Sequence, residues 1–255
     1  MPQEIVTFGP SFCGATLIVL VHLFIHRSRF LKGQQNPWPD FLAGIALGYL
    51  FVEIFPHLAS FQQKLLAAAD GGPLGFLEHH AYLMAAAGFL VHLAIGLSGE
   101  RARSQRVPET ISIGNLPLAV GLSAFSLAAY AFLIGYMLAE QPTHRAGAGI
   151  GFGVAMAAHF VGLDHFYRDR YPQLWDAALR YVLAGAVYGG WIFGVTGELS
   201  DPVYALAFTF LAGGLIVATP LFELPRVKSW RSYASFCAGA IVFSALILFV
   251  QHFDL

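Results

Sequence analysis

Residues 116–138 have the sequence LPLAVGLSAFSLAAYAFLIGYML, which is 23 consecutive positions without a charged side chain. A helix of about 20 apolar residues, rising about 1.5 Å per residue, crosses the hydrocarbon core of a bilayer. This stretch is therefore predicted to be a transmembrane helix. The composition of the whole chain agrees, because 57% of its 255 residues are hydrophobic and only 11% are charged, against about a quarter charged in a soluble domain.

Seven further apolar stretches of similar length lie on both sides of this one. Gly and Pro residues interrupt the sequence between most of them, as at Pro37 and Pro39. Because the connections are short, consecutive helices should pack antiparallel in one bundle. We predict an all-α membrane bundle that forms a single domain over residues 1–255. Its eight transmembrane helices should lie at about 8–26, 41–58, 80–97, 116–138, 147–165, 179–195, 203–222 and 233–249.

The basic residues predict the orientation of these helices. Of the 14 Lys and Arg residues, all but Lys64 and Arg145 fall in connections on one side of the predicted bundle. Basic loops stay in the cytoplasm, so both termini are expected outside it. The expected location is the plasma membrane of a bacterium, with the lipid bilayer as the main partner and a second copy of the chain as a candidate one. The net charge of -1 does not indicate a nucleic-acid partner.

Ionisable residues inside a predicted span are costly and indicate a functional site. Glu53 and His57 lie four residues apart in the second stretch, so that both side chains share one helical face. A carboxylate and an imidazole at this spacing can bind one divalent cation. The alternative is a Glu–His hydrogen bond within the bundle. Pro56 between them should weaken the local helix.

The fifth stretch carries His159, Asp164 and His165. His159 lies inside the apolar run. Asp164 and His165 lie at its cytoplasmic end, where the simplest expectation for Asp164 is a surface ion pair with Arg168, four residues on. His22 and His92 lie in other stretches, and a lone His in a bundle is more often a hydrogen-bond partner than a ligand.

Two motifs resemble the ZIP (Zrt/Irt-like) family of divalent metal transporters, which has eight spans and both termini outside. The family's second helix ends in a pattern similar to HLLPE, and here residues 53–57 are EIFPH, with His and Glu exchanged. Its seventh helix has a small-residue turn before a sequence similar to ELP, and here AGGLIV at 212–217 leads to ELP at 223–225.

The resemblance also implies a changed central metal site on the fourth and fifth helices. The family has a run similar to H-x-x-x-D/E-G on the fourth helix, where this chain has Tyr130 and Ile134 in place of the ligands. On the fifth helix, similar to HExPHE in the family, only His159 and an acid, Asp164, are kept. The implied metal residues are His159 with Tyr130 at the centre, Glu53 and His57 on the outer path, and Asp164, His165 and Glu223 on the inner path.

Three functions follow as alternatives. The first is a divergent ZIP-like transporter of a divalent metal ion, zinc foremost, without catalytic activity and with no resident cofactor beyond a bound zinc or similar cation. The second is a ZIP-like membrane protein that does not transport, such as a sensor or assembly partner. The third is a membrane-embedded zinc hydrolase, which the geometry disfavours because His159 and Asp164 should point about 140° apart on an ideal helix.

Overall fold

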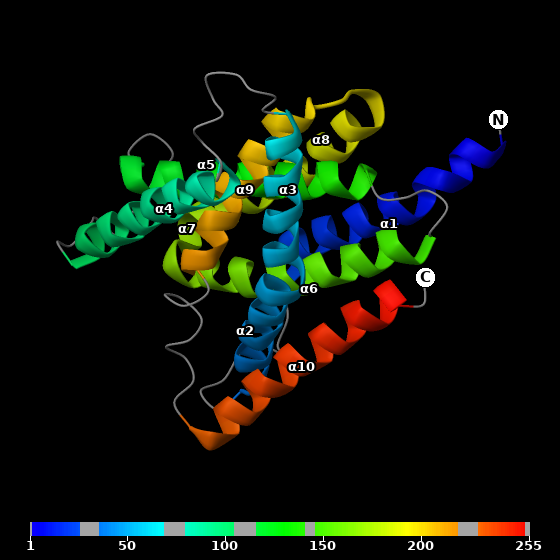
Figure 1. Ribbon diagram of the computed structural model, residues 1–255. Helices are drawn as coiled ribbons and strands as arrows, with labels where there is room; N and C mark the ends of the chain where they lie inside the picture. The colour runs from blue at the N-terminus through cyan, green and yellow to red at the C-terminus, as the bar shows by residue number, and fades with distance from the viewer. Residues whose placement is uncertain are drawn as a thin grey trace.

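The computed structural model describes residues 2–25, 36–68, 80–104, 116–140, 146–218 and 229–252. Within these residues the chain is helical and has no strand, which confirms the predicted all-α class. The helices are α1 (Pro2–Phe24), α2 (Trp38–Tyr49), η3 (Leu50–Ile54), α3 (Phe55–Ala68), α4 (His80–Ser104), α5 (Leu118–Ala139), α6 (Ala146–Arg170), α7 (Pro172–Leu174), η5 (Trp175–Leu179), α8 (Arg180–Thr196), α9 (Asp201–Ala218) and α10 (Trp230–His252). Figure 1 shows that the start of α1 and the end of α10 lie toward the same side of the molecule.

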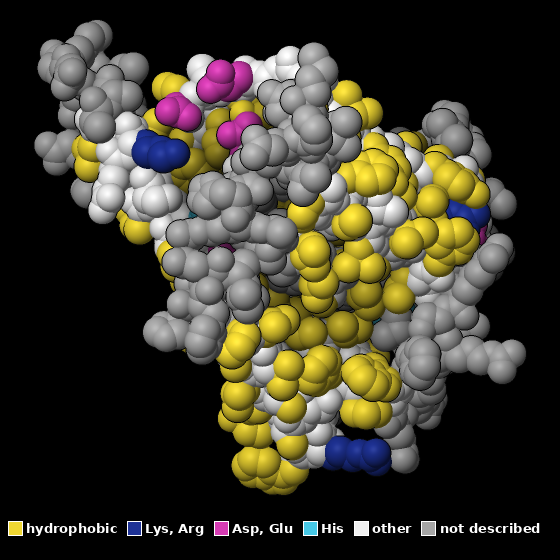
Figure 2. Space-filling model, turned by 90° about the vertical axis from the view of Figure 1, so that its right-hand side faces the viewer, with side chains coloured by type: hydrophobic (Ala, Val, Ile, Leu, Met, Phe, Trp, Pro, Cys, Tyr) yellow, Lys and Arg dark blue, Asp and Glu magenta, His cyan; other side chains and the backbone are white. Residues whose placement is uncertain are grey.

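Four helices in the described part of the chain are long and apolar enough to cross a membrane: 38–66, 120–139, 172–196 and 230–249. Shorter apolar helices occupy 8–24, 81–94 and 201–217. Large hydrophobic side chains are also exposed on the outside, including Leu118 at 78% and Phe125 at 72%. In Figure 2 hydrophobic side chains spread across the middle of the visible face, and the coloured charged ones lie near its margins. This is the surface expected of an integral membrane protein.

Helix α2 continues through η3 into α3 without a break, so the second helix ends at Ala68 instead of near residue 58. Pro56 has no N–H group, and in an α-helix its ring would collide with the carbonyl of Val52. The π-helical turn before it widens the backbone, and the Phe55 N–H donates to the Leu50 carbonyl five residues back. The proline therefore shapes the helix here and does not end it.

The expected loop between the fifth and sixth stretches is almost entirely helical. Helix α6 ends at Arg170 and α7 begins at Pro172, so only Tyr171 separates them. Because Pro172 lacks an N–H group, it cannot continue α6, but it fits the first turn of the next helix. The basic residues of this connection therefore lie on helix ends.

Glycine residues allow the closest helix contacts. A Cβ atom added to Gly44 on α2 would collide with the Phe236 carbonyl on α10, and one added to Gly48 would lie 3.0 Å from the Ala240 carbonyl oxygen. The contact partners advance together along both helices, so α2 and α10 run parallel. Such close approach is typical of helix pairs in membranes, where Cα–H groups face carbonyl oxygens.

Three more pairs show the same parallel advance, and none joins consecutive helices. Between α8 and α5, Gly190 contacts Phe132 and Gly194 contacts Tyr136. Between α9 and α4, Gly213 contacts Ala85 and Gly214 contacts His92. Between α6 and α1, Gly153 contacts Gly14 and Asp164 contacts His22. The expected antiparallel packing of consecutive helices is thus not the closest packing in the structure, because the small residues lie where parallel helices cross.

Candidate functional site

His159 lies at the centre of the bundle and is 1% exposed. Its ring centroid is 5.4 Å from that of Tyr49 on α2 and 6.2 Å from that of Tyr130 on α5. Neither ring nitrogen has a hydrogen-bond partner among the described residues. A buried polar group without a partner costs free energy, and more so in a membrane protein. The imidazole therefore leaves two nitrogen sites open in the middle of an apolar core.

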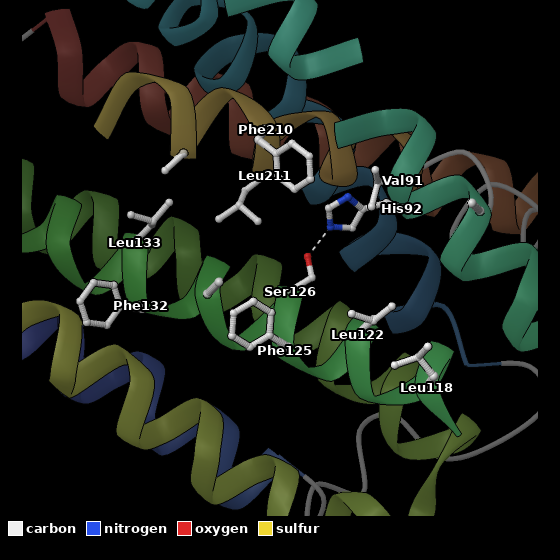
Figure 3. A pocket seen from close by; sticks show the side chains of 13 residues that line it. Val91, His92, Leu118, Leu122, Phe125, Ser126, Phe132, Leu133, Phe210 and Leu211 are labelled. Atoms are coloured by element: carbon white, nitrogen blue, oxygen red, sulfur yellow. Dashed lines mark hydrogen bonds between the residues drawn. The ribbon is translucent and has the colours of Figure 1, made fainter. Parts of the chain in front are cut away.

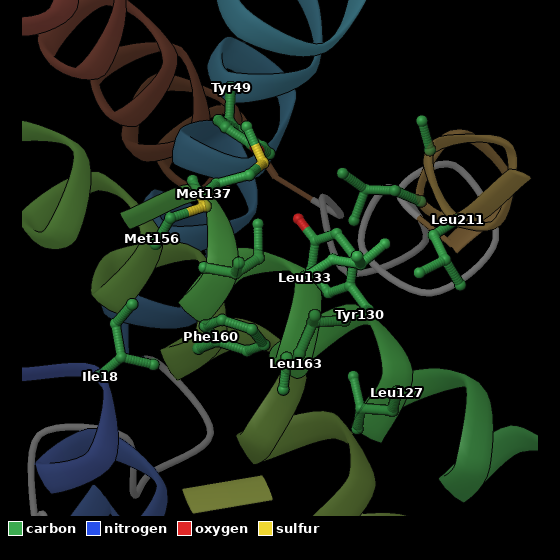
Figure 4. Close-up of a cluster of buried hydrophobic side chains, with 14 of the residues drawn as sticks. Ile18, Tyr49, Leu127, Tyr130, Leu133, Met137, Met156, Phe160, Leu163 and Leu211 are labelled. Atoms are coloured by element: carbon green, nitrogen blue, oxygen red, sulfur yellow. The ribbon is translucent and has the colours of Figure 1, made fainter. Parts of the chain in front are cut away.

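Tyr130 adds a second buried polar group. Its hydroxyl is buried and lies beside Tyr49, the residue with which it interacts. Figure 4 shows this hydroxyl on the side of the ring that faces Tyr49 and Met137. Tyr49 in turn lies close enough to Glu53 for an electrostatic interaction. Helices α2, α5 and α6, together with η3, thus bring two phenols, an imidazole and a carboxylate toward one buried region.

Glu53 and His57 lie on either side of the junction between η3 and α3, and the structure brings them together as the i,i+4 spacing predicted. Glu53 is buried and His57 is half-buried. The His57 Nδ1 donates to the Glu53 backbone carbonyl at 2.8 Å and lies 3.5 Å from the Glu53 carboxylate oxygen Oε2. With Nδ1 engaged in this way, Nε2 is the His57 nitrogen that can bind a further ligand.

The expected surface pair of Asp164 with Arg168 is wrong. Asp164 is fully buried and accepts hydrogen bonds from His22 Nδ1 on α1, at 3.0 and 2.8 Å for its two carboxylate oxygens. His22 is fully buried as well, and its Nε2 has no hydrogen-bond partner among the described residues. The reason is that Asp164 faces α1, 142 residues earlier in the chain, whereas i,i+4 spacing considers one helix only.

The remaining predicted residues are not gathered at His159. His165 is half-buried and follows Asp164 on α6, and Glu223 lies outside the described residues. Over the ranges that the structure describes, no three His, Cys, Asp or Glu side chains group closely enough to bind a metal ion. The described central region therefore contains His159 together with Tyr49 and Tyr130.

Sequence reasoning missed Tyr49 and did not identify the partners of His22 and His92. Tyr49 is an aromatic residue in an apolar run, and nothing in its surroundings distinguishes it from a core residue. His22 was expected to be a hydrogen-bond partner, but the carboxylate that it contacts, Asp164, belongs to a helix 142 residues later in the chain. Ser126, which hydrogen-bonds His92 Nε2 from α5, is one small polar residue in an uncharged run. No local pattern identifies these pairings.

Comparison of the chain with protein-family models, with curated proteins and with solved structures gave no match. The assignment of a function therefore rests on the residues and their geometry.

Proposed function

We propose that the chain is a divergent ZIP-like membrane transporter of a divalent metal ion, with zinc as the first candidate. The observation that carries this proposal is His159, which is buried, has no hydrogen-bond partner for either ring nitrogen among the described residues, and lies beside Tyr130. Polar groups inside a membrane bundle face a partner or a pathway. Imidazole nitrogen is a preferred zinc ligand, and an oxygen partner is compatible with zinc.

The helix directions support an eight-span topology. The described chain has continuous helices over 2–24, 38–68, 80–104, 118–139, 146–170, 172–196, 201–218 and 230–252. If each crosses the membrane in turn, odd-numbered helices point one way and even-numbered ones the other. The four parallel pairs join the first with the fifth, the second with the eighth, the third with the seventh and the fourth with the sixth. In each pair the two helices are therefore both odd-numbered or both even-numbered. Parallel helices must be so if successive helices cross the membrane in alternating directions.

In this topology the ion follows a path along the bundle. Glu53 and His57 receive it on the outer side, because the second helix runs outward and they lie past its middle. His159 with Tyr130 forms the central position. The inner part consists of Asp164 with its partner His22, together with His165. The resemblance also assigns Glu223 to it, a residue that lies outside the described ranges. Few ligands at each position fit a path in which binding is weak enough for release. The distribution of basic residues supports a topology with both termini outside the cytoplasm, in the plasma membrane of a bacterium.

Proton movement is the second candidate, and one observation favours it. Over the described ranges no three ligand side chains gather around one point, and zinc usually takes four ligands. A proton needs only a succession of groups that accept and donate, such as His159, Tyr130 and the His22–Asp164 pair.

Flux into proteoliposomes tests the proposal. Vesicles containing the native chain should accumulate zinc, and His159→Ala should remove most of the uptake. Met156→Ala is the matched control, because Met156 is buried one turn earlier on the same helix and its truncation also leaves a cavity. Uptake of protons without zinc would replace the metal proposal by the proton one. If neither zinc nor protons enter, and iron and manganese do not enter either, the chain is not a transporter and the sensor or assembly role replaces it.

A further inference from the structure

A groove of about 860 Å³ lies between α4, α5 and α9. Figure 3 shows Leu118, Leu122 and Phe125 along one side and Phe210 and Leu211 along the other. The volume falls within the range of about 300–1,000 Å³ that is typical of ligand sites. Among the residues that line it, His92 and Ser126 are the polar ones. The groove is therefore suited to an apolar occupant of considerable size.

The groove opens toward the surface that faces lipid. Leu118 and Phe125, two of its lining residues, are among the most exposed hydrophobic side chains of the described structure. Its lining along α5 extends from Leu118 to Leu133, which is about 22 Å at the rise of an α-helix. Half of the hydrocarbon core is about 15 Å thick. A chain lying in the groove would thus reach from the membrane interface past the midplane, as a long acyl chain does.

The two polar residues of the groove are paired with each other. His92 Nδ1 donates to the Gly88 carbonyl at 2.7 Å, so in the neutral ring Nε2 accepts the hydrogen bond of the Ser126 hydroxyl. Both residues also line a second cavity of about 60 Å³ that includes Tyr130 and Tyr167. The His92–Ser126 pair therefore forms a shared wall between the groove and the interior. Apart from this pair, the side chains that line the groove are apolar.

Two arginines belong to the end of α4 at which such a chain would enter. Figure 1 shows that α4 and α5 run in opposite directions, so the last turns of α4 and the first turns of α5 lie at the same end. The last turns of α4 contain Arg101 and Arg103, and α5 begins at Leu118 beside the groove. Basic residues next to a span attract anionic lipid headgroups.

We propose that this groove binds one acyl chain of an anionic phospholipid, with the phosphate at the Arg101 and Arg103 end of α4. The acyl chain covers the exposed apolar wall of α5, and the His92–Ser126 pair keeps it out of the interior. The proposal needs the chain to be in a membrane, but it does not depend on transport.

Photocrosslinking tests the proposal. The full chain is placed in nanodiscs that contain phosphatidylglycerol with a photoactivatable acyl chain, and the adducts are mapped by mass spectrometry. We expect adducts concentrated on the α5 segment that contains Leu122 and Phe125. Ala129→Phe and, as a milder variant on the exposed side, Leu122→Trp should fill the groove and remove most of these adducts. Ala87→Phe is the matched control, because Ala87 is exposed on α4 outside the groove and should leave them unchanged.

Further arms identify the headgroup and exclude other occupants. Phosphatidylcholine with the same photoactivatable chain, or Arg101→Gln with Arg103→Gln, should give clearly fewer groove adducts. The proposal is overturned if adducts spread evenly over the lipid-facing helices, if groove-filling variants do not reduce them, or if both lipids label the groove equally. Crosslinks between two protein copies at Leu122, lost in Ala129→Phe, would also overturn it and would show that the groove is a dimer interface.

Discussion

His22 on α1 donates its Nδ1 proton to Asp164 on α6 at 2.8 Å, and neither side chain is exposed. Removing one member leaves the other buried without its partner, which costs about 3–5 kcal/mol. We therefore expect Asp164→Leu and His22→Leu each to lower the unfolding free energy by this order. The double variant should lose less than the sum of the two. A double-mutant cycle measured by denaturation in detergent checks this, and additive losses would show that the two groups do not interact.

His159→Leu is predicted to have the opposite effect on stability, because neither ring nitrogen of His159 has a hydrogen-bond partner among the described residues. Replacing a buried, unsatisfied polar side chain by an apolar one of similar size removes a desolvation cost of about 1–3 kcal/mol. We expect His159→Leu to raise the melting temperature while it removes zinc or proton flux. His22→Leu, a histidine of equal burial on a neighbouring helix, is the comparison and should lower the melting temperature. A fall for both variants would indicate that His159 has a structural partner.

Gly190 should be intolerant of a side chain, because a Cβ atom there would collide with the Phe132 carbonyl on α5. Since the obstacle is backbone, the helices must move apart, and overpacking of this kind costs about 1–3 kcal/mol. Gly185 lies on the same helix with nothing within 4 Å of an added Cβ. Gly185→Ala should therefore be neutral or stabilising by up to about 1 kcal/mol, through helix propensity. Thermal unfolding of the two alanine variants compares them directly, and equal losses would contradict the close packing of α5 and α8.

The proposed topology predicts that α9 crosses the membrane, although it is one of the shorter apolar helices. Ser200 and Ser229 are both exposed, and α9 lies between them in sequence. In a variant without Cys13 and Cys237, a membrane-impermeant maleimide added to intact cells should label Ser200→Cys. It should label Ser229→Cys only after permeabilisation. Labelling of both positions from the same side would remove α9 from the set of spans and contradict the eight-span proposal.

The sequence predicted well what depends on local chemistry. Long uncharged runs become helices because a backbone in lipid must satisfy its own hydrogen bonds. The i,i+4 spacing of Glu53 and His57 places them together, because both lie on one helix. Pro56 was expected to weaken its helix, but sequence alone did not indicate that a π-helical turn would accommodate the proline and let the helix continue to Ala68.

The amino-acid sequence by itself determined that this protein is built of apolar helices, because composition and the length of each run decide that without reference to neighbours. Tertiary structure alone decided which helices meet. It paired α1 with α6 through His22 and Asp164 and joined parallel helices at their glycines. It also left the His159 nitrogens without a hydrogen-bond partner in the described part of the chain. The physical reason is that the apolar runs of helices such as α1, α5 and α9 have hydrophobic side chains on nearly all sides, so their hydrophobic pattern does not select their neighbours. Close fit at small residues and a few buried polar contacts select them instead.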